Sequence, residues 1–159
     1  MARGEAAPGL SVPVLPVVQR LAATLAKVYR DKGIDCRIEV DESIRFFGDE
    51  GDLMEFMGNL MENGFKYARQ RVRIKADHQS RAKGGPSSLM LEIEDDGPGI
   101  PSQMCDEVLN RGARIDQQIP GQGIGLSVAS EIVRLYRGKL RIDESELGGA
   151  KIQLHFPHR

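Results

Sequence analysis

Two glycine-rich segments, DDGPGIP at residues 95–101 and GQGIGL at residues 121–126, divide the second half of this chain of 159 residues. The first directly follows residues 89–93, where every second residue is Leu or Ile, a pattern that predicts a half-buried strand. The second leads into apolar residues at helical spacing, so its glycines stand at the start of a helix. We therefore expect the chain to pass from a strand through a tight turn and a long connection into a glycine-rich helix start.

Apolar periodicity predicts the other elements. Helices are expected at residues 14–28, with Gly33 as a stop, and at residues 124–135, with Gly138 as cap. A third helix is expected after Asp49, which serves as its N-cap. Val28 and Leu135 are expected on the apolar faces of their helices. Strands are expected at residues 35–40, 44–47, 72–76, 89–93, 140–142 and 152–156, the last two joined across Gly148 and Gly149. The polar segment 80–88 is expected to be a turn or a disordered loop. These elements predict an α+β layer in which the helices cover one face of a sheet.

Length and composition bound the class of protein. The length predicts one domain, at residues 14–159, after a flexible tail at residues 1–13. A net charge of −1 gives no electrostatic argument for a nucleic-acid or membrane-surface partner, and no apolar run reaches the length of a membrane span. Cys36 and Cys105 form no CxxC pair, so we expect reduced thiols and no zinc site.

Asn59, Asn63, Lys66 and Tyr67 lie at positions i, i+4, i+7 and i+8, which places them along one face of the second helix. On this face Asn63 can offer a neutral oxygen to Mg²⁺, and Lys66 can reach a phosphate as a mobile point charge. Tyr67 can pack against a base or a sugar. The alternative is that this face is simply solvated.

Asp95 and Asp96 stand where the strand meets the glycine turn. A carboxylate there can accept a hydrogen bond from the exocyclic amine of adenine, while glycines let the backbone approach the ring. Asp95, at the first position of D-x-G-x-G, suits this role better, and Asp96 is expected to face solvent. The alternative is an ordinary acidic turn, because Asp, Gly and Pro are common turn residues.

Gly121, Gly123 and Gly125 expose backbone N–H groups at a helix N-terminus, where phosphate is favoured. The segment follows no strand and the chain has no GxxxxGK[ST] sequence, so neither a dinucleotide-binding nor a P-loop fold is predicted. A flexible hinge is the alternative. Arg111 and Arg114 lie in the preceding connection, where a guanidinium group can either close over a triphosphate or remain solvated on the surface.

Taken together and in this order, the three motifs resemble the N, G1 and G2 boxes of the GHKL ATPase superfamily, and specifically the catalytic ATP-binding domain of bacterial sensor histidine kinases. The resemblance covers about residues 14–156, and the wording MGN-x-x-x-N-x-x-KY, EDDGPGIP and PGQG-x-GL is similar to that of PhoQ-type kinases. It implies the Bergerat fold, an α+β sandwich with about three helices on one face of a mixed, mostly antiparallel sheet. It also implies ATP and Mg²⁺ as cofactors and a lid at residues 101–122.

Carried over position by position, the resemblance implies roles for single residues. Asn63 would bind Mg²⁺, and Asn59, Asn63 and Lys66 would form the catalytic set beside the phosphates. The nucleotide would contact Asn63, Lys66, Tyr67, Asp95, Gly97, Gly99, Ile100, Arg111, Arg114, Gly121, Gln122, Gly123, Ile124, Gly125 and Leu126. Val108 and Leu109 stand where many of these kinases carry lid aromatics, so the packing of the lid is expected to differ.

The resemblance also separates a kinase from a hydrolase. GHKL hydrolases place a general-base Glu four residues before the Mg-binding Asn, whereas this chain has Asn59 there, and an amide cannot take a proton from water. Glu62 projects about 100° away around the helix. His78, His155 and His158 all lack the sequence context of the family's acceptor histidine. We therefore expect a protein-histidine kinase module that transfers the γ-phosphate of ATP to a histidine on a dimerisation hairpin absent from this chain.

This interpretation implies two partners, the acceptor-histidine domain of the same parent kinase and a response regulator, with no nucleic acid and no direct membrane contact. The domain is expected to be monomeric by itself and cytoplasmic, in a parent that is an inner-membrane sensor. Two other classes stay open. One is a non-catalytic nucleotide-binding regulatory module, and the other is an anti-sigma-type kinase that phosphorylates a protein serine.

Overall fold

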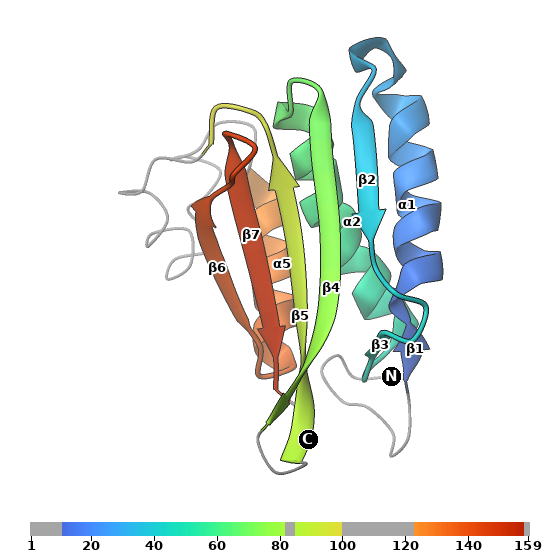
Figure 1. Ribbon diagram of the computed structural model, residues 1–159, viewed down its shortest axis with the longest axis vertical. Helices are drawn as coiled ribbons and strands as arrows, with labels where there is room; N and C mark the ends of the chain where they lie inside the picture. The colour runs from blue at the N-terminus through green and yellow to red at the C-terminus, as the bar shows by residue number, and fades with distance from the viewer. Residues whose placement is uncertain (1–10, 82–84, 100–122, 158–159) are drawn as a thin grey trace.

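The computed structural model describes residues 11–81, 85–99 and 123–157. In these ranges the chain forms two layers, with helices packed on one face of a five-stranded sheet (Figure 1). The helices are α1 (Val14–Val28), α2 (Glu50–Tyr67) and α5 (Gly123–Leu135), and a 3-10 turn, η1 (Arg30–Lys32), follows α1. The strands of the sheet are β2 (Asp35–Glu39), β4 (Arg71–Arg81), β5 (Gly85–Asp95), β6 (Lys139–Glu144) and β7 (Ala150–Phe156).

The sheet has the order β2-β4-β5-β7-β6, in which β2 and β4 are parallel and every other pair is antiparallel. The expected α+β fold, with helices over a mixed and mostly antiparallel sheet, is therefore confirmed. A separate antiparallel pair joins β1 (Val12–Pro13) to β3 (Arg45–Phe46). Val12 is buried in that pair, so the last residues of the predicted flexible tail belong to the fold instead.

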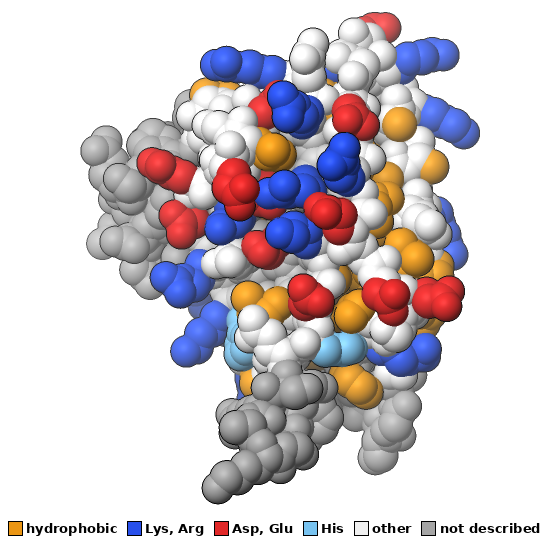
Figure 2. All heavy atoms as spheres, viewed as in Figure 1, with side chains coloured by type: hydrophobic (Ala, Val, Ile, Leu, Met, Phe, Trp, Pro, Cys, Tyr) orange, Lys and Arg blue, Asp and Glu red, His pale blue; other side chains and the backbone are white. Residues whose placement is uncertain are grey.

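Alternation along the strands sorts side chains between the two faces of the sheet. Ile74 of β4 and its partner Ile93 of β5 are buried beneath the helices. The opposite face carries mixed charges, and Figure 2 shows Lys and Arg side chains interspersed with Asp and Glu across it. Asp95 continues the inward series that runs through Leu91 and Ile93, so its carboxylate lies on the helix side of the sheet.

Helix α2 supplies the centre of the core. Its predicted N-cap is confirmed, because the Asp49 carboxylate accepts a hydrogen bond from the backbone N–H of Asp52 at 3.1 Å. Six of its apolar side chains are fully buried, each contributing about 1.5–3 kcal/mol relative to an exposed position; they are Leu53, Phe56, Met57, Leu60, Met61 and Phe65. The ring of Phe156 lies 5.4 Å from that of Phe56, which fixes β7 against the helix layer.

Some local predictions are wrong. The segment predicted as a loop at residues 80–88 is mostly strand, because β4 continues to Arg81 and β5 starts at Gly85, and backbone pairing does not require apolar side chains. Val28 and Leu135 are 64% and 47% exposed, since each is the last residue of its helix.

Two helix ends differ from their predicted form. Gly33 ends η1 in the left-handed conformation, with φ 61°, whereas α1 has already ended at Val28. After α5 the positive φ of 60° falls on Arg137, while Gly138 is needed for space, because a Cβ atom there would lie 3.0 Å from the carbonyl oxygen of His155. Within the described ranges, no helix has the length and hydropathy needed to cross a bilayer.

Candidate functional site

Four segments meet at one edge of the molecule, the upper edge in Figure 1. They are the C-terminal end of α2, the end of β5, the turn between β6 and β7, and the N-terminal end of α5. The first, second and fourth of these carry the three sequence motifs. Segments that are far apart in the sequence therefore bring the described parts of the three motifs to one edge.

Asp95 lies at the centre of this edge and is only 8% exposed. Its Oδ1 accepts hydrogen bonds from the backbone N–H groups of Gly97, at 2.8 Å, and Ala150, at 3.4 Å. Burial raises the pKa of Asp95, although these two N–H groups act to lower it. Among the described residues, both hydrogen bonds fall on Oδ1, so Oδ2 is the oxygen that can accept one from a ligand.

Glycines surround this carboxylate because no larger residue fits. A Cβ atom at Gly97 would lie 2.2 Å from the carbonyl oxygen of Tyr67, and one at Gly149 would lie 2.2 Å from Oδ1 of Asp95. Gly99 has φ +78° and faces Gly149. Sequence reasoning placed Gly149 only in a hairpin turn and missed its contact with Asp95. The doubled glycine was the available signal, because the turn itself uses only the positive φ of Gly148.

Asp96 has a structural role that the sequence did not predict. Its Oδ1 accepts hydrogen bonds from the backbone N–H groups of Arg69, Gln70 and Arg71, at 2.7, 3.0 and 3.1 Å. Burial acts to raise the pKa of Asp96, but these backbone donors lower it overall. The expectation that Asp96 simply faces solvent is wrong, since its carboxylate joins the glycine turn to the connection between α2 and β4.

The polar face of α2 lies beside the start of α5. Asn59, Asn63 and Tyr67 are partly buried and Lys66 is exposed. A Cβ atom at Gly125 would lie 3.7 Å from the side-chain oxygen of Asn59, so the first turn of α5 passes close to this face. The helix motif and the second glycine motif are thus neighbours in space.

Lys32, which no motif contains, fixes the end of α2. Its Nζ donates hydrogen bonds to the carbonyl oxygens of Phe65, at 2.8 Å, and Lys66, at 2.6 Å. A cation at this position also interacts favourably with the negative end of the helix dipole. The hydrogen bonds of Lys32 therefore attach η1 to the last turn of α2, which carries Lys66 and Tyr67.

Several predicted residues are placed incompletely. Leu126 is 1% exposed and belongs to the hydrophobic core. Gly123 and Ile124 are described only as the first two residues of α5. Ile100, Arg111, Arg114, Gly121, Gln122 and the lid at residues 101–122 lie outside the described residues.

The side chains at this edge include one group suited to a metal ion. Within the described part of the chain, no group of three or more His, Cys, Asp or Glu side chains could hold a metal ion. The amide oxygen of Asn63 is a hard, neutral ligand of the kind that Mg²⁺ accepts when phosphate and water oxygens fill its other positions. The residues present therefore fit a Mg²⁺ that arrives with a phosphorylated ligand.

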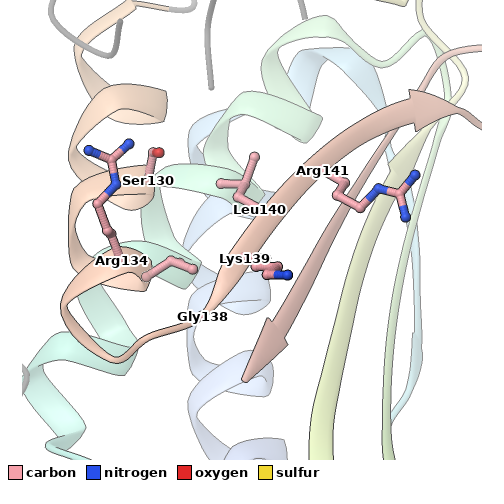
Figure 3. Close-up of a pocket in the computed structure, with 7 residues that line it drawn as sticks. Ser130, Arg134, Gly138, Lys139, Leu140 and Arg141 are labelled. Carbon is pink, nitrogen blue, oxygen red and sulfur yellow. The ribbon is translucent and has the colours of Figure 1, made fainter. Parts of the chain in front are cut away.

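A hollow of about 250 Å³ lies between the C-terminal half of α5 and the start of β6. It is lined by Ser130, Val133, Arg134, Gly138, Lys139, Leu140 and Arg141. Figure 3 shows the side chains of Arg134 and Arg141 extending away from each other, so their charges do not converge on one ligand. None of the predicted site residues lines it.

Known proteins resemble this chain in sequence and in fold. Residues 48–159 match the family described as Histidine kinase-, DNA gyrase B-, and HSP90-like ATPase. The chain is 40% identical over 144 residues to Sensor protein PhoQ of Escherichia coli (strain K12), a match that covers 91% of this chain and 28% of that protein. The chain thus spans less than a third of the length of this relative.

Solved structures agree in fold. A mycobacterial sensor histidine kinase, MprB, superposes with a TM-score of 0.76 at 27% identity, over 94% of this chain and 97% of that one. Full-length ShkA in complex with AMPPNP superposes with a TM-score of 0.75 at 22% identity, over 99% of this chain and 32% of ShkA, and supports the fold alone. The fold is that of a histidine-kinase ATPase domain. The chain belongs to the histidine kinase-, DNA gyrase B- and HSP90-like ATPase family, and the resemblance to PhoQ-type kinases is confirmed.

Proposed function

We propose that this chain is the ATP-binding catalytic domain of a two-component sensor histidine kinase. It binds ATP with Mg²⁺ and donates the γ-phosphate to a histidine on a dimerisation hairpin elsewhere in the parent protein. The observation that carries this proposal is the buried Asp95 carboxylate, held through Oδ1 beside the polar face of α2 and the start of α5. The family match and the relatives named as sensor kinases support it.

Adenine is selected by the Asp95 carboxylate. Oδ2 accepts a hydrogen bond from the exocyclic amine, and this bond is strengthened because the acceptor is ionised. Gly97 and Gly149 let the backbone pack directly around this carboxylate, because a Cβ atom at either would collide with the carbonyl oxygen of Tyr67 or with Oδ1 of Asp95. A base with a carbonyl oxygen in place of the amine places two acceptors face to face and is rejected.

The phosphates lie where α5 begins. Backbone N–H groups of its glycine-rich first turn and the positive end of its dipole favour an anion there. Lys66 adds a cation from α2. Asn63 would hold Mg²⁺ through its amide oxygen, and the metal would supply positive charge beside the phosphates. Arg111, Arg114 and Gln122 complete the proposed set from the lid.

Asn59 favours transfer over hydrolysis. It lies on the helix face turned toward Gly125, where a carboxylate would be able to activate water. An amide at this position holds a hydrogen bond but takes no proton, so water is a poor nucleophile. The γ-phosphate is therefore retained until an imidazole reaches it in line.

Neither described histidine can reach the site within the same domain. His78 lies on β4, which starts beside the site at Arg71, so the intervening strand places it about 23 Å away. His155 pairs with Met90 on β5, about 17 Å along the strand from Asp95. The acceptor domain of the parent kinase, and a response regulator that takes the phosphoryl group onward, are the proposed partners. The proposed location is the cytoplasmic side of an inner-membrane sensor.

A calorimetric titration with a non-hydrolysable ATP analogue tests the adenine site. Asp95→Asn should weaken binding about 10- to 150-fold, because a hydrogen bond to a charged group contributes about 1.5–3 kcal/mol. Asp77→Asn is the matched control, since it removes an exposed carboxylate from the distant part of β4. Unchanged affinity in Asp95→Asn would refute the assignment.

Phosphotransfer needs a second experiment. The purified chain is mixed with labelled ATP and an acceptor-histidine hairpin from a PhoQ-type kinase. Label on that histidine, lost in acid, supports the kinase. A non-catalytic module would leave the hairpin unlabelled, and a serine kinase would give an acid-stable product.

A further inference from the structure

The turn between β6 and β7 is bound by a buried carboxylate on the outer face of the sheet. Glu94 is only 2% exposed, and its Oε2 accepts a hydrogen bond from Nε of Arg73 at 2.9 Å and forms an ion pair with Nη2 of Arg73 at 2.8 Å. Its Oε1 accepts a hydrogen bond from the Ser145 hydroxyl at 2.9 Å. Ser145 is itself buried, so this bond is protected from water.

Ser145 also shapes the turn that follows it. Its hydroxyl oxygen accepts a hydrogen bond from the N–H of Leu147 at 3.0 Å, and its own N–H donates to the carbonyl oxygen of Gly149 at 2.8 Å. The N–H of Gly148 donates to the carbonyl oxygen of Ser145 at 3.0 Å. One side chain therefore joins the conformation of the turn to the position of Glu94.

The same turn contacts the Asp95 side chain. The N–H of Gly149 donates to the carbonyl oxygen of Asp95 at 3.1 Å, and the N–H of Ala150 donates to its Oδ1 at 3.4 Å. Glu94 and Asp95 are neighbours on β5, so their side chains point to opposite faces. The turn thus binds both of them, one from each face of the sheet.

We propose that Ser145, held by Glu94, is a positioning residue for the Asp95 carboxylate. By fixing the turn, it directs the N–H of Ala150 at Oδ1 and keeps Gly149 packed against that oxygen. Oδ1 is then committed to the backbone, and Oδ2 is presented to the adenine amine. This inference rests on the proposed ATP site and adds to it a residue that does not touch the nucleotide.

The test compares ATP with inosine 5′-triphosphate, which has the same phosphates and sugar but an oxygen in place of the amine. Dissociation constants for both, with Mg²⁺, are measured for the wild-type chain and for Ser145→Ala. The preference for ATP should fall about fivefold in the variant, because the hydrogen bonds of the Ser145 hydroxyl no longer hold the turn that aligns Asp95. Affinity for inosine triphosphate should change much less.

Two further variants complete the experiment. Ser145→Thr keeps the hydroxyl and should recover most of the preference. Ser43→Ala is the matched control, because its hydroxyl also donates to a carboxylate, that of Asp41, in an exposed turn, and it should leave the preference unchanged.

The outcomes separate the two proposals. If Ser145→Ala weakens both nucleotides equally, or neither, Ser145 does not position Asp95 and the inference is overturned. If the wild-type chain binds neither nucleotide, the proposed function itself fails.

Discussion

Gly97 lies directly against the carbonyl oxygen of Tyr67, so close that a Cβ atom at residue 97 would come within 2.2 Å of it. Tyr67 is the last residue of α2, and Gly97 follows Asp95 at the end of β5. The helix layer and the sheet therefore touch backbone to backbone beside the carboxylate that we assign to adenine. The position of Asp95 depends on this contact as much as on its own strand.

Gly97→Ala should disrupt the site. The added methyl group meets backbone rather than a movable side chain, so the turn must shift, at a cost of about 1–3 kcal/mol. We expect at least about tenfold weaker binding of an ATP analogue by calorimetry, together with a lower melting temperature. Gly58→Ala is the control, since its Cβ atom would meet only a Leu21 methyl group at 3.5 Å in a helix. Equal affinities for the two variants would contradict the close contact.

Binding of ATP should weaken on acidification, and the loss should begin at a pH above the usual pKa of an aspartate. Burial raises the pKa of Asp95, and the adenine amine needs the ionised carboxylate as acceptor. Affinity should therefore fall as the pH decreases through this raised pKa. The folding stability of the domain without ATP should change with pH in the opposite direction. A raised pKa contributes stability at low pH, and this contribution is lost as the pH rises through that pKa. Titrations of Asp95→Asn at the same pH values show how much of the change in affinity comes from protonation of the ATP phosphates. Parallel curves of affinity against pH for both proteins would contradict the prediction.

Sequence periodicity was enough to predict the helices and the main strands, and the sequence motif was enough to single out Asp95. These features depend on residues close together in the chain, such as the alternation of Leu89, Leu91 and Ile93 directly before the acidic pair. The roles of Gly149 and Lys32 were not predicted, because each depends on a contact with a segment far away in the sequence. Asp96 was misjudged for the same reason, since its partners lie on the connection between α2 and β4.

Lys32→Met should loosen the end of α2. The ammonium group binds the carbonyl oxygens of Phe65 and Lys66, and its loss should lower the free energy of unfolding by about 1 kcal/mol in urea denaturation. Lys27→Met is the matched control, because Lys27 also lies in the last turn of a helix but its ammonium group makes no hydrogen bond among the described residues. Similar losses in both variants would show that the carbonyl contacts contribute nothing beyond the helix dipole.

Asn63→Ala should reduce the contribution of Mg²⁺ to binding and leave the contribution of adenine unchanged. If the amide oxygen of Asn63 binds Mg²⁺, the variant should lose most of the gain in affinity that Mg²⁺ gives to an ATP analogue. Its affinity without Mg²⁺ should stay within about twofold of wild type, because Asp95 still binds adenine. Gln70→Ala, which removes an exposed amide near the same edge, should keep the full effect of Mg²⁺. An unchanged metal titration for Asn63→Ala would refute its role.

Tyr136→Phe should destabilise the fold at neutral pH and change its response to alkali. The Tyr136 hydroxyl donates to Oδ2 of Asp52 at 2.5 Å and accepts from the N–H of Asp49 at 3.2 Å, which ties the end of α5 to the start of α2. Removing it should cost about 1–3 kcal/mol, since Asp52 is only 5% exposed and loses a donor.

Burial, followed by the hydrogen bond to Asp52, raises the pKa of Tyr136 to about 12. The folded state then holds a proton that the unfolded chain releases near its ordinary value of 10.0. The stability that this proton contributes is complete below that value and is lost as the pH rises toward about 12. Urea denaturation across this range should show a steeper decline for the wild-type chain than for Tyr136→Phe. Parallel declines would mean that Tyr136 does not hold its proton through the contact with Asp52.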